Sequence, residues 1–92
     1  MYALSKDAQE LLFSQARTAN TFSPEPVTDE QMKALYELAK WGPTSMNTQP
    51  MRLVLARSAE AKDKVINNLF DGNKPKATMA PLVEVIAADL DF

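Results

Sequence analysis

A helix that begins after Thr28 is the feature that most constrains this chain. Thr28 and Gln31 have the spacing of a capping box, in which each side chain bonds the backbone N–H of the other residue. At the other end, Gly42 is placed to cap the helix and Pro43 prevents it from continuing. The sequence therefore predicts a helix with both ends fixed.

One face of this helix is apolar. Its apolar residues recur at helical spacing, and Val27 and Met32 occupy the positions of a hydrophobic staple. The stripe consists of Met32, Leu35, Tyr36, Leu38 and Ala39. We expect this face to be buried, and we expect Trp41, just beyond it, to be a packing residue.

The rest of the chain predicts two further helices and two strands. Residues 17–26 contain two prolines and read as irregular, and residues 74–81 are ambiguous between coil and a short helical turn. The first helix is capped by Ser5 and fades near Ala16, and its apolar face consists of Leu4, Ala8, Leu11 and Leu12. The other helix runs from Ser58 to about Leu69 and is buried at Val65, Ile66 and Leu69. The strands are expected over residues 51–57 and 82–88, with a turn at residues 71–73.

Two strands do not form a stable sheet by themselves. The sequence also stops at Asp91 and Phe92, directly after a strand. We therefore expect the 92 residues to be one part of a longer polypeptide, or to need a partner chain. The alternative is a small complete helical domain with one hairpin-like pair of strands.

Composition excludes several classes of site. The chain has no cysteine and no histidine, so it lacks a thiol nucleophile, disulfides and the commonest metal ligand and general base. We expect no metal site, and an enzyme built from this chain would delegate its chemistry to a cofactor. Only two glycines are present, which argues against a Rossmann or P-loop phosphate site.

Charge and hydropathy bound the location and the partners. The net charge is −2, so no basic field attracts nucleic acid or anionic lipid. The N-terminal residues lack the apolar core of a signal peptide, and no run approaches the ~20 apolar residues of a membrane span. We expect a cytoplasmic protein that binds neither nucleic acid nor membrane.

Three polar clusters fall between the expected elements, where ligands are commonly bound. Residues 17–20 offer the Arg17 guanidinium, suited to a phosphate, with Thr18 and Asn20 beside it. Residues 43–50, the polar loop, carry five hydrogen-bonding side chains between two prolines. Residues 72–76 add Asn73 with Lys74 and Lys76, and a lysine there can stabilise negative charge. Each cluster also has a structural interpretation without a ligand. Residues 17–20 would be a helix end with a solvated arginine, residues 43–50 an ordinary helix-to-strand connection, and residues 72–76 a turn with solvated lysines.

The remaining acidic residues predict no chemistry. Asp29 and Glu30 are favourable acids in the first turn of a helix and not a catalytic pair. Asp89 and Asp91 lie at a strand end, where the sequence indicates no partner for them.

In order and spacing, the three clusters resemble the nitroreductase family. Within it they are most similar to the subgroup that includes the malonic semialdehyde reductase of pyrimidine breakdown, also called a 3-hydroxypropionate dehydrogenase. The middle motif is the specific one. The matching residues are 16–22, 40–47, Gly72, Asn73, Lys76, Ala80 and Pro81. The resemblance covers nearly the whole chain but only the N-terminal half of the family's usual single domain.

The resemblance implies an α+β fold, with helices around an antiparallel or mixed sheet, present here as a partial domain. It implies a homodimer that binds FMN at the subunit interface. NADH or NADPH would reduce FMN, and reduced FMN would then pass a hydride to a nitro compound, a quinone or a small aldehyde acid, in a ping-pong mechanism. The alternative is a non-catalytic fragment or a helical interaction module without a complete flavin site.

Site residues follow from the resemblance by position. Arg17, Thr18 and Asn20 would hold the FMN phosphate and flavin edge. Asn73 and Lys76 would lie near the flavin ring. The residues expected to contact the flavin of the partner subunit are Pro43, Thr44, Ser45 and Asn47.

Two residues depart from the family's pattern. Asn20 stands where many members have a basic residue, so we expect phosphate binding at this site to be weaker or to use a different set of residues. Glu84 interrupts the otherwise apolar strand over residues 82–88. A carboxylate in a strand buried on both faces is costly without a partner, so Glu84 requires either an open face or a partner group.

Overall fold

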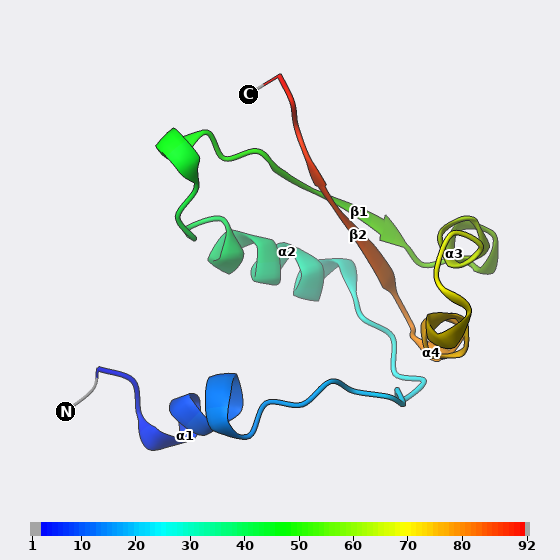
Figure 1. Cartoon of the computed structure of the whole chain (residues 1–92), viewed down its shortest axis with the longest axis horizontal. Coiled ribbons are helices and arrows are strands. Elements are labelled where there is room, and N and C mark those ends of the chain that lie inside the picture. The colour runs from blue at the N-terminus through cyan, green and yellow to red at the C-terminus, as the bar shows by residue number, and fades with distance from the viewer. Residues whose placement is uncertain (1–2, 92) are drawn as a thin grey trace.

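The computed structural model describes residues 3–91 and has an α+β architecture (Figure 1). The two strands cross near the middle of the view, α2 runs beside them, and α3 and α4 lie together at one end. An extended coil carries α1 away from the other elements. The helices and strands are α1 (Lys6–Gln9), α2 (Asp29–Ala39), β1 (Met51–Ala56), α3 (Ala59–Ile66), α4 (Lys74–Met79) and β2 (Val83–Ala88).

The amino end of α2 is built as the sequence predicts. The Thr28 N–H donates to Gln31 Oε1 at 2.9 Å, and the Gln31 N–H donates to Thr28 Oγ1 at 3.1 Å. Arg57, just beyond β1, adds a tertiary anchor: its Nη1 donates to Asp29 Oδ1 at 2.7 Å and its Nη2 to Val27 O at 3.0 Å. The first turn of α2 is therefore fixed both by its own cap and by the strand.

The prediction that Gly42 caps the carboxyl end of α2 is wrong, because the C-cap residue is Lys40. The helix ends at Lys40 in right-handed conformation, and neither glycine of the chain has a positive φ. The Gly42 N–H donates to Ala39 O at 3.0 Å, and a Cβ on Gly42 would lie 3.3 Å from that oxygen. Close approach to a carbonyl, not a left-handed turn, is what favours glycine here.

The strands pair antiparallel, with Met51 opposite Ala88 and Ala56 opposite Val83. Both expected strands are confirmed, each shorter by one residue at one end. A further backbone bond, from the Asp89 N–H to Pro50 O at 2.8 Å, extends the ladder toward the polar loop. Glu84 lies opposite Leu55 and is exposed, so the open face is the alternative that holds in this chain.

The helices at the far end of the sheet are joined by one lysine. Ser58 caps α3 as expected, by accepting from the Ala61 N–H at 3.1 Å. Within the ambiguous residues 74–81, the first six form α4. Lys62 Nζ donates to Thr78 O at 3.0 Å and to Ala80 O at 2.5 Å. These bonds tie α3 to the end of α4 and to the entry of β2.

The first helix begins where the sequence predicts, but it does not remain a regular α-helix. The Ser5 hydroxyl accepts from the Ala8 N–H at 3.1 Å, as a cap residue should. After Gln9 the helix continues as a π-helical turn, Glu10–Ser14, and residues 17–26 form an irregular coil, as expected. Its apolar side is exposed, with Leu11 76% accessible, so nothing within residues 3–91 covers it.

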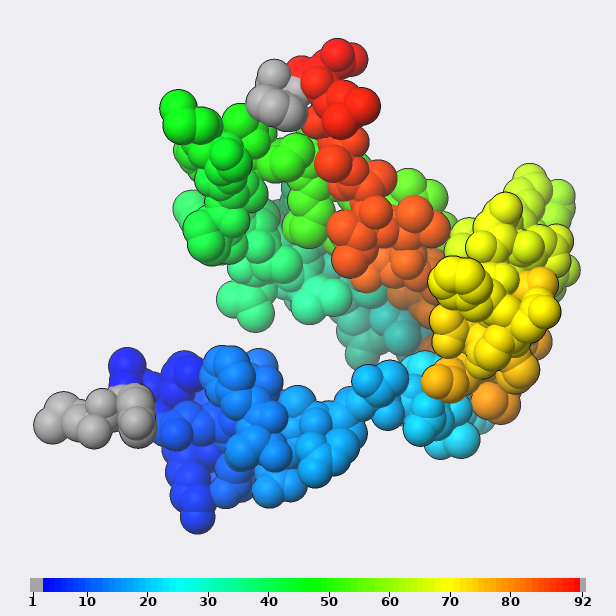
Figure 2. Space-filling model, in the orientation of Figure 1, coloured from blue at the N-terminus to red at the C-terminus, as the bar shows by residue number. Residues whose placement is uncertain are grey.

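Little of the chain is buried. Among residues 3–91, the buried hydrophobic residues are Met32, Ala56, Ile66 and Ala80. The accessible surface is 7876 Å², whereas a compact monomer of 10.2 kDa exposes about 5,300 Å². Figure 2 shows the segment around α1 standing apart from the rest of the molecule. The chain therefore exposes about half again as much surface as a compact monomer of its mass.

The apolar faces predicted to be buried are correspondingly open. Of the α2 stripe, Met32 is buried, whereas Leu38 remains 76% accessible. Trp41 is 79% accessible, so the packing role expected for it is not fulfilled within this chain. Among the helices of residues 3–91, none has the length and apolar character to cross a membrane.

Candidate functional site

The polar loop, residues 43–50, connects the end of α2 to the start of β1. It contains one 3-10 turn, Ser45–Asn47. Met46, Asn47 and Gln49 all have positive φ, at 53°, 55° and 50°. Non-glycine residues adopt this region at a cost, although asparagine tolerates it better than most. Specific bonds must therefore hold the loop in this shape.

Those bonds come from within the loop. The Gln49 N–H donates to Thr44 Oγ1 at 3.1 Å, and Gln49 Nε2 donates to Asn47 Oδ1 at 3.0 Å. The backbone N–H of Asn47 donates to Thr44 O at 3.1 Å. Thr44 and Gln49 thus close the loop on itself.

The loop leaves two groups available to a ligand. Ser45 and Asn47 are exposed, and among residues 3–91 neither the Ser45 hydroxyl nor the Asn47 Nδ2 group forms a hydrogen bond to protein. Pro43 is exposed at the start of the loop, whereas Thr44 is half-buried and its oxygen is engaged by Gln49. Of the four predicted contact residues, Ser45 and Asn47 are free to bind, and Thr44 mainly shapes the loop.

A cavity of about 540 Å³ lies beside the loop, between it, the end of α2 and the start of β1. Two cations border it, and both are already paired: Lys40 with Glu37 at 2.5 Å, and Arg52 with Asp89 at 2.9 Å. The hydrogen bond from Lys40, together with its positive charge, lowers the pKa of Glu37. The cavity is therefore electrically balanced, and it offers hydrogen bonds and not net charge.

The Arg17 cluster lies on the extended coil that follows the π-helical turn. Arg17 Nη1 donates to Ala16 O at 2.7 Å, and this is its sole hydrogen bond among residues 3–91. Thr18 and Asn20 are exposed, without partners in the same part of the chain. The remaining guanidinium donors and both short side chains are open to an anion.

The third cluster lies at the start of α4. Asn73 precedes the helix, and its side chain makes no capping bond. Lys74 is paired with Asp71 at 3.0 Å, whereas Lys76 takes part in no ion pair among residues 3–91. Of the two lysines, Lys76 is the one free to offset charge on a ligand.

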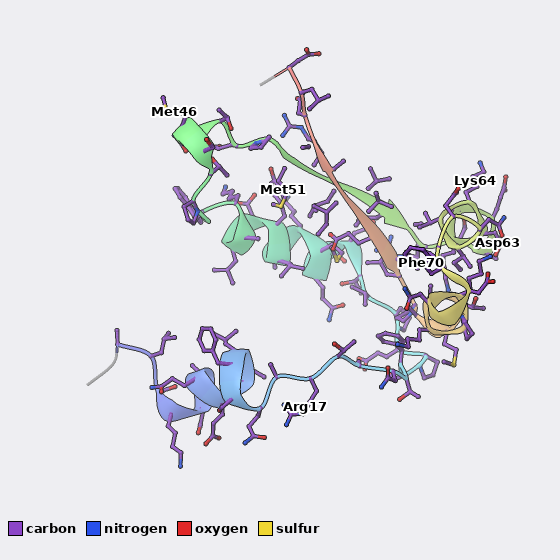
Figure 3. All side chains as sticks on the ribbon, in the orientation of Figure 1. Arg17, Met46, Met51, Asp63, Lys64 and Phe70 are labelled. Carbon is purple, nitrogen blue, oxygen red and sulfur yellow. The ribbon has the colours of Figure 1, made fainter. Side chains whose placement is uncertain are left out.

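One copy of the chain does not bring the three clusters together. Figure 3 labels Arg17 on the coil, Met46 at the tip of the polar loop and Phe70 just before the third cluster, and these residues lie at three separate corners. The three clusters therefore do not form one site within a single copy of the chain.

Two ion pairs that position the loop and α2 were missed from the sequence. Asp89 has a partner, Arg52, in contrast to the prediction, and Asp29 pairs with Arg57. Both arginines lie in or just after β1, and their carboxylates are 37 and 28 residues away in sequence. The two arginines, Arg52 and Arg57, are visible in the sequence, but the antiparallel register is needed to choose the partner of Arg52.

Comparison with known proteins places the chain in a sequence family. The sequence model described as the Nitroreductase family matches residues 14–89. A Streptomyces griseus protein is 54% identical over 97% of this chain, and a Streptomyces coelicolor protein is 52% identical over the same share. A Stenotrophomonas maltophilia protein is 45% identical over 99% of the chain. All three share the name "Putative NADH dehydrogenase/NAD(P)H nitroreductase". The chain covers 45–46% of their length, about half of each relative.

Proposed function

The chain belongs to the nitroreductase family, and from that premise we propose that it supplies the N-terminal half of an FMN-dependent NAD(P)H oxidoreductase. The proposed substrates are nitro compounds, quinones or a small aldehyde acid such as malonic semialdehyde. The last follows from the subgroup that the motifs at residues 16–22 and 40–47 resemble. The names of the relatives support the reductant, NADH or NADPH.

The observation that carries the proposal is the construction of the polar loop. It is held in a strained shape by its own bonds, and it presents the Ser45 hydroxyl and the Asn47 amide outward. The neighbouring cavity is electrically balanced. Such a surface suits the uncharged, hydrogen-bonding edge of a flavin ring better than a phosphate.

The residues of this chain fit FMN by the chemistry of their donors. The open guanidinium of Arg17, with Thr18 and Asn20, would hold the phosphate. Asn73 and the unpaired Lys76 would lie near the ring, where a cation offsets the charge of the reduced form. Bound FMN supplies the redox chemistry, by accepting a hydride from NAD(P)H and passing it to the substrate.

Assembly as a homodimer accounts for the separation of the clusters. The polar loop would serve the flavin held by Arg17 of the other copy. The excess surface of the chain, about 2,600 Å² above that of a compact monomer, is large enough for the rest of the domain and a partner subunit to cover.

The second candidate is that the 92 residues alone act as a non-catalytic fragment. The small core and the half-length match favour it for the isolated chain. Assays of NADH and NADPH oxidation with added FMN separate the two. We define the completed domain as this chain joined to the part of the Streptomyces griseus relative that follows the matched region. Turnover by the completed domain and none by the chain alone is expected, and turnover by the isolated chain would reject the fragment hypothesis.

Arg17→Ala is expected to weaken FMN binding by the completed domain. Loss of one hydrogen bond to a charged group costs about 1.5–3 kcal/mol, roughly a 10- to 150-fold rise in Kd. Fluorescence titration with FMN measures it. Lys64→Ala, which also removes an exposed cation, is the control and should leave the Kd unchanged. Equal Kd values for the Arg17 variant and the unchanged protein would remove Arg17 from the site.

A further inference from the structure

Among residues 3–91, Arg52 in β1 is the residue outside the polar loop whose side chain bonds the carboxyl end of that loop. Its Nη1 donates to Gln49 O at 3.2 Å and to Met51 O at 2.9 Å, and its Nη2 donates to Asp89 Oδ2 at 2.9 Å. One planar guanidinium therefore joins the loop, the first strand and the residue that follows the second strand. Lysine, with one nitrogen, could not reach all these acceptors in fixed geometry.

Gln49 is the residue through which Arg52 reaches the loop. It is the last of the three positive-φ residues, and its N–H and side-chain amide hold Thr44 and Asn47. A residue held in left-handed conformation returns to its preferred region when its bonds are released. The loop shape that presents Asn47 thus depends on Gln49, and the carbonyl of Gln49 is bonded by Arg52.

The carboxylate of Asp89 is itself fixed. Its backbone N–H donates to Pro50 O at 2.8 Å, and its Oδ1 accepts from the Asp91 N–H at 2.9 Å. Its Oδ2 is then aimed at Arg52. The ion pair is partly exposed, with 54% of the Arg52 side chain and 34% of the Asp89 side chain accessible, so its electrostatic contribution to stability is small. Its main effect is to orient the guanidinium.

We propose that Arg52 is a positioning residue for the polar loop, acting through Gln49, and that Asp89 orients Arg52 for this role. The consequence for FMN affinity rests on the proposed function, in which Ser45 and Asn47 contact the flavin. The consequence for the loop shape does not, since the bonds that hold the loop are all formed within this chain.

Arg52→Met in the completed domain is the main test. Methionine keeps an unbranched stem and removes the guanidinium. Loss of one hydrogen bond to the loop predicts a roughly tenfold rise in the Kd for FMN. Arg57→Met is the matched control, because Arg57 also joins a strand end to a carboxylate and a carbonyl, but at α2. It should lower the melting temperature by a similar amount and leave the Kd unchanged.

The ¹³C-methyl resonance of Met46, at the loop tip, gives a readout independent of FMN. In Arg52→Met the Met46 signal should shift or broaden while that of Met79, in α4, stays in place. Asp89→Asn should produce the same changes to a smaller degree, and it decides the matter if Arg52→Met does not fold. An unmoved Met46 signal, or equal losses of FMN affinity in the Arg52 and Arg57 variants, would overturn the proposal. A completed domain that binds no FMN would reject the proposed function. The Met46 methyl resonance would still test the role of Arg52, because it does not depend on FMN.

Discussion

Alone, the 92-residue chain is expected to lose its structure on heating without a cooperative transition, whereas the completed domain should unfold in one sharp step. The physical reason is the size of the core. Four hydrophobic residues are buried among residues 3–91, and the radius of gyration is 15.9 Å against about 12 Å for a compact chain of this length. Net stability is a small difference between large terms, so the uncovered apolar surface decides the outcome.

Calorimetry and near-ultraviolet circular dichroism measure this difference. The isolated chain should give no calorimetric peak and a weak aromatic signal, since Trp41 is 79% accessible. The completed domain, at the same concentration, serves as the control and should give both. A sharp calorimetric peak for the isolated chain would show that its own contacts suffice, and would refute the inference drawn from its surface.

Mixing two defective versions of the completed domain is expected to restore about a quarter of the FMN sites, the fraction that follows from random pairing of subunits in a two-fold dimer. One version carries Arg17→Ala. The other carries Ser45→Ala with Asn47→Asp, which removes two free donors of the polar loop. If the loop serves the flavin of the partner, each mixed dimer has one site with both Arg17 and the loop intact.

The loop version is designed to keep the loop shape. Aspartate tolerates the positive φ of residue 47 nearly as well as asparagine, and its oxygen can still accept from Gln49 Nε2. Loss of two hydrogen bonds predicts that this version alone binds FMN about 100-fold more weakly.

The readout is the number of high-affinity FMN sites, counted by titration after the two versions are unfolded together and refolded. The separate homodimers, treated in the same way, are the controls. A count that stays at the level of the homodimers would mean that the loop and Arg17 of one copy serve the same flavin, and would contradict the shared site.

Local features of the fold could be predicted because they depend on neighbours in sequence. The Thr28–Gln31 capping box and the Ser58 cap are short-range bonds, and both were found. Gly42 was misassigned because a glycine near a helix end is often its cap residue, whereas here the cap is Lys40 and Gly42 lies two residues beyond it. The pairing of Arg52 with Asp89 depends on strand register, which no local pattern specifies.

The candidate site was predictable as a set of residues and not as an arrangement. Composition and spacing identified the polar loop. The different roles of its residues, with Thr44 bonded to Gln49 and Asn47 presenting its amide, follow from three positive φ angles. The apolar faces of α1 and α2 lie open in this chain, which spans about half the length of the relatives it matches. Which apolar residues are buried depends on all the elements that pack against them, so burial could not be inferred from the pattern within single helices.

Titration with FMN tests the central claim most directly. The completed domain is expected to bind one FMN per chain and to remain yellow after gel filtration, whereas the isolated 92-residue chain should retain none. A completed domain that unfolds cooperatively and yet binds no FMN would contradict the assignment of Arg17, the polar loop and Lys76 to a flavin site.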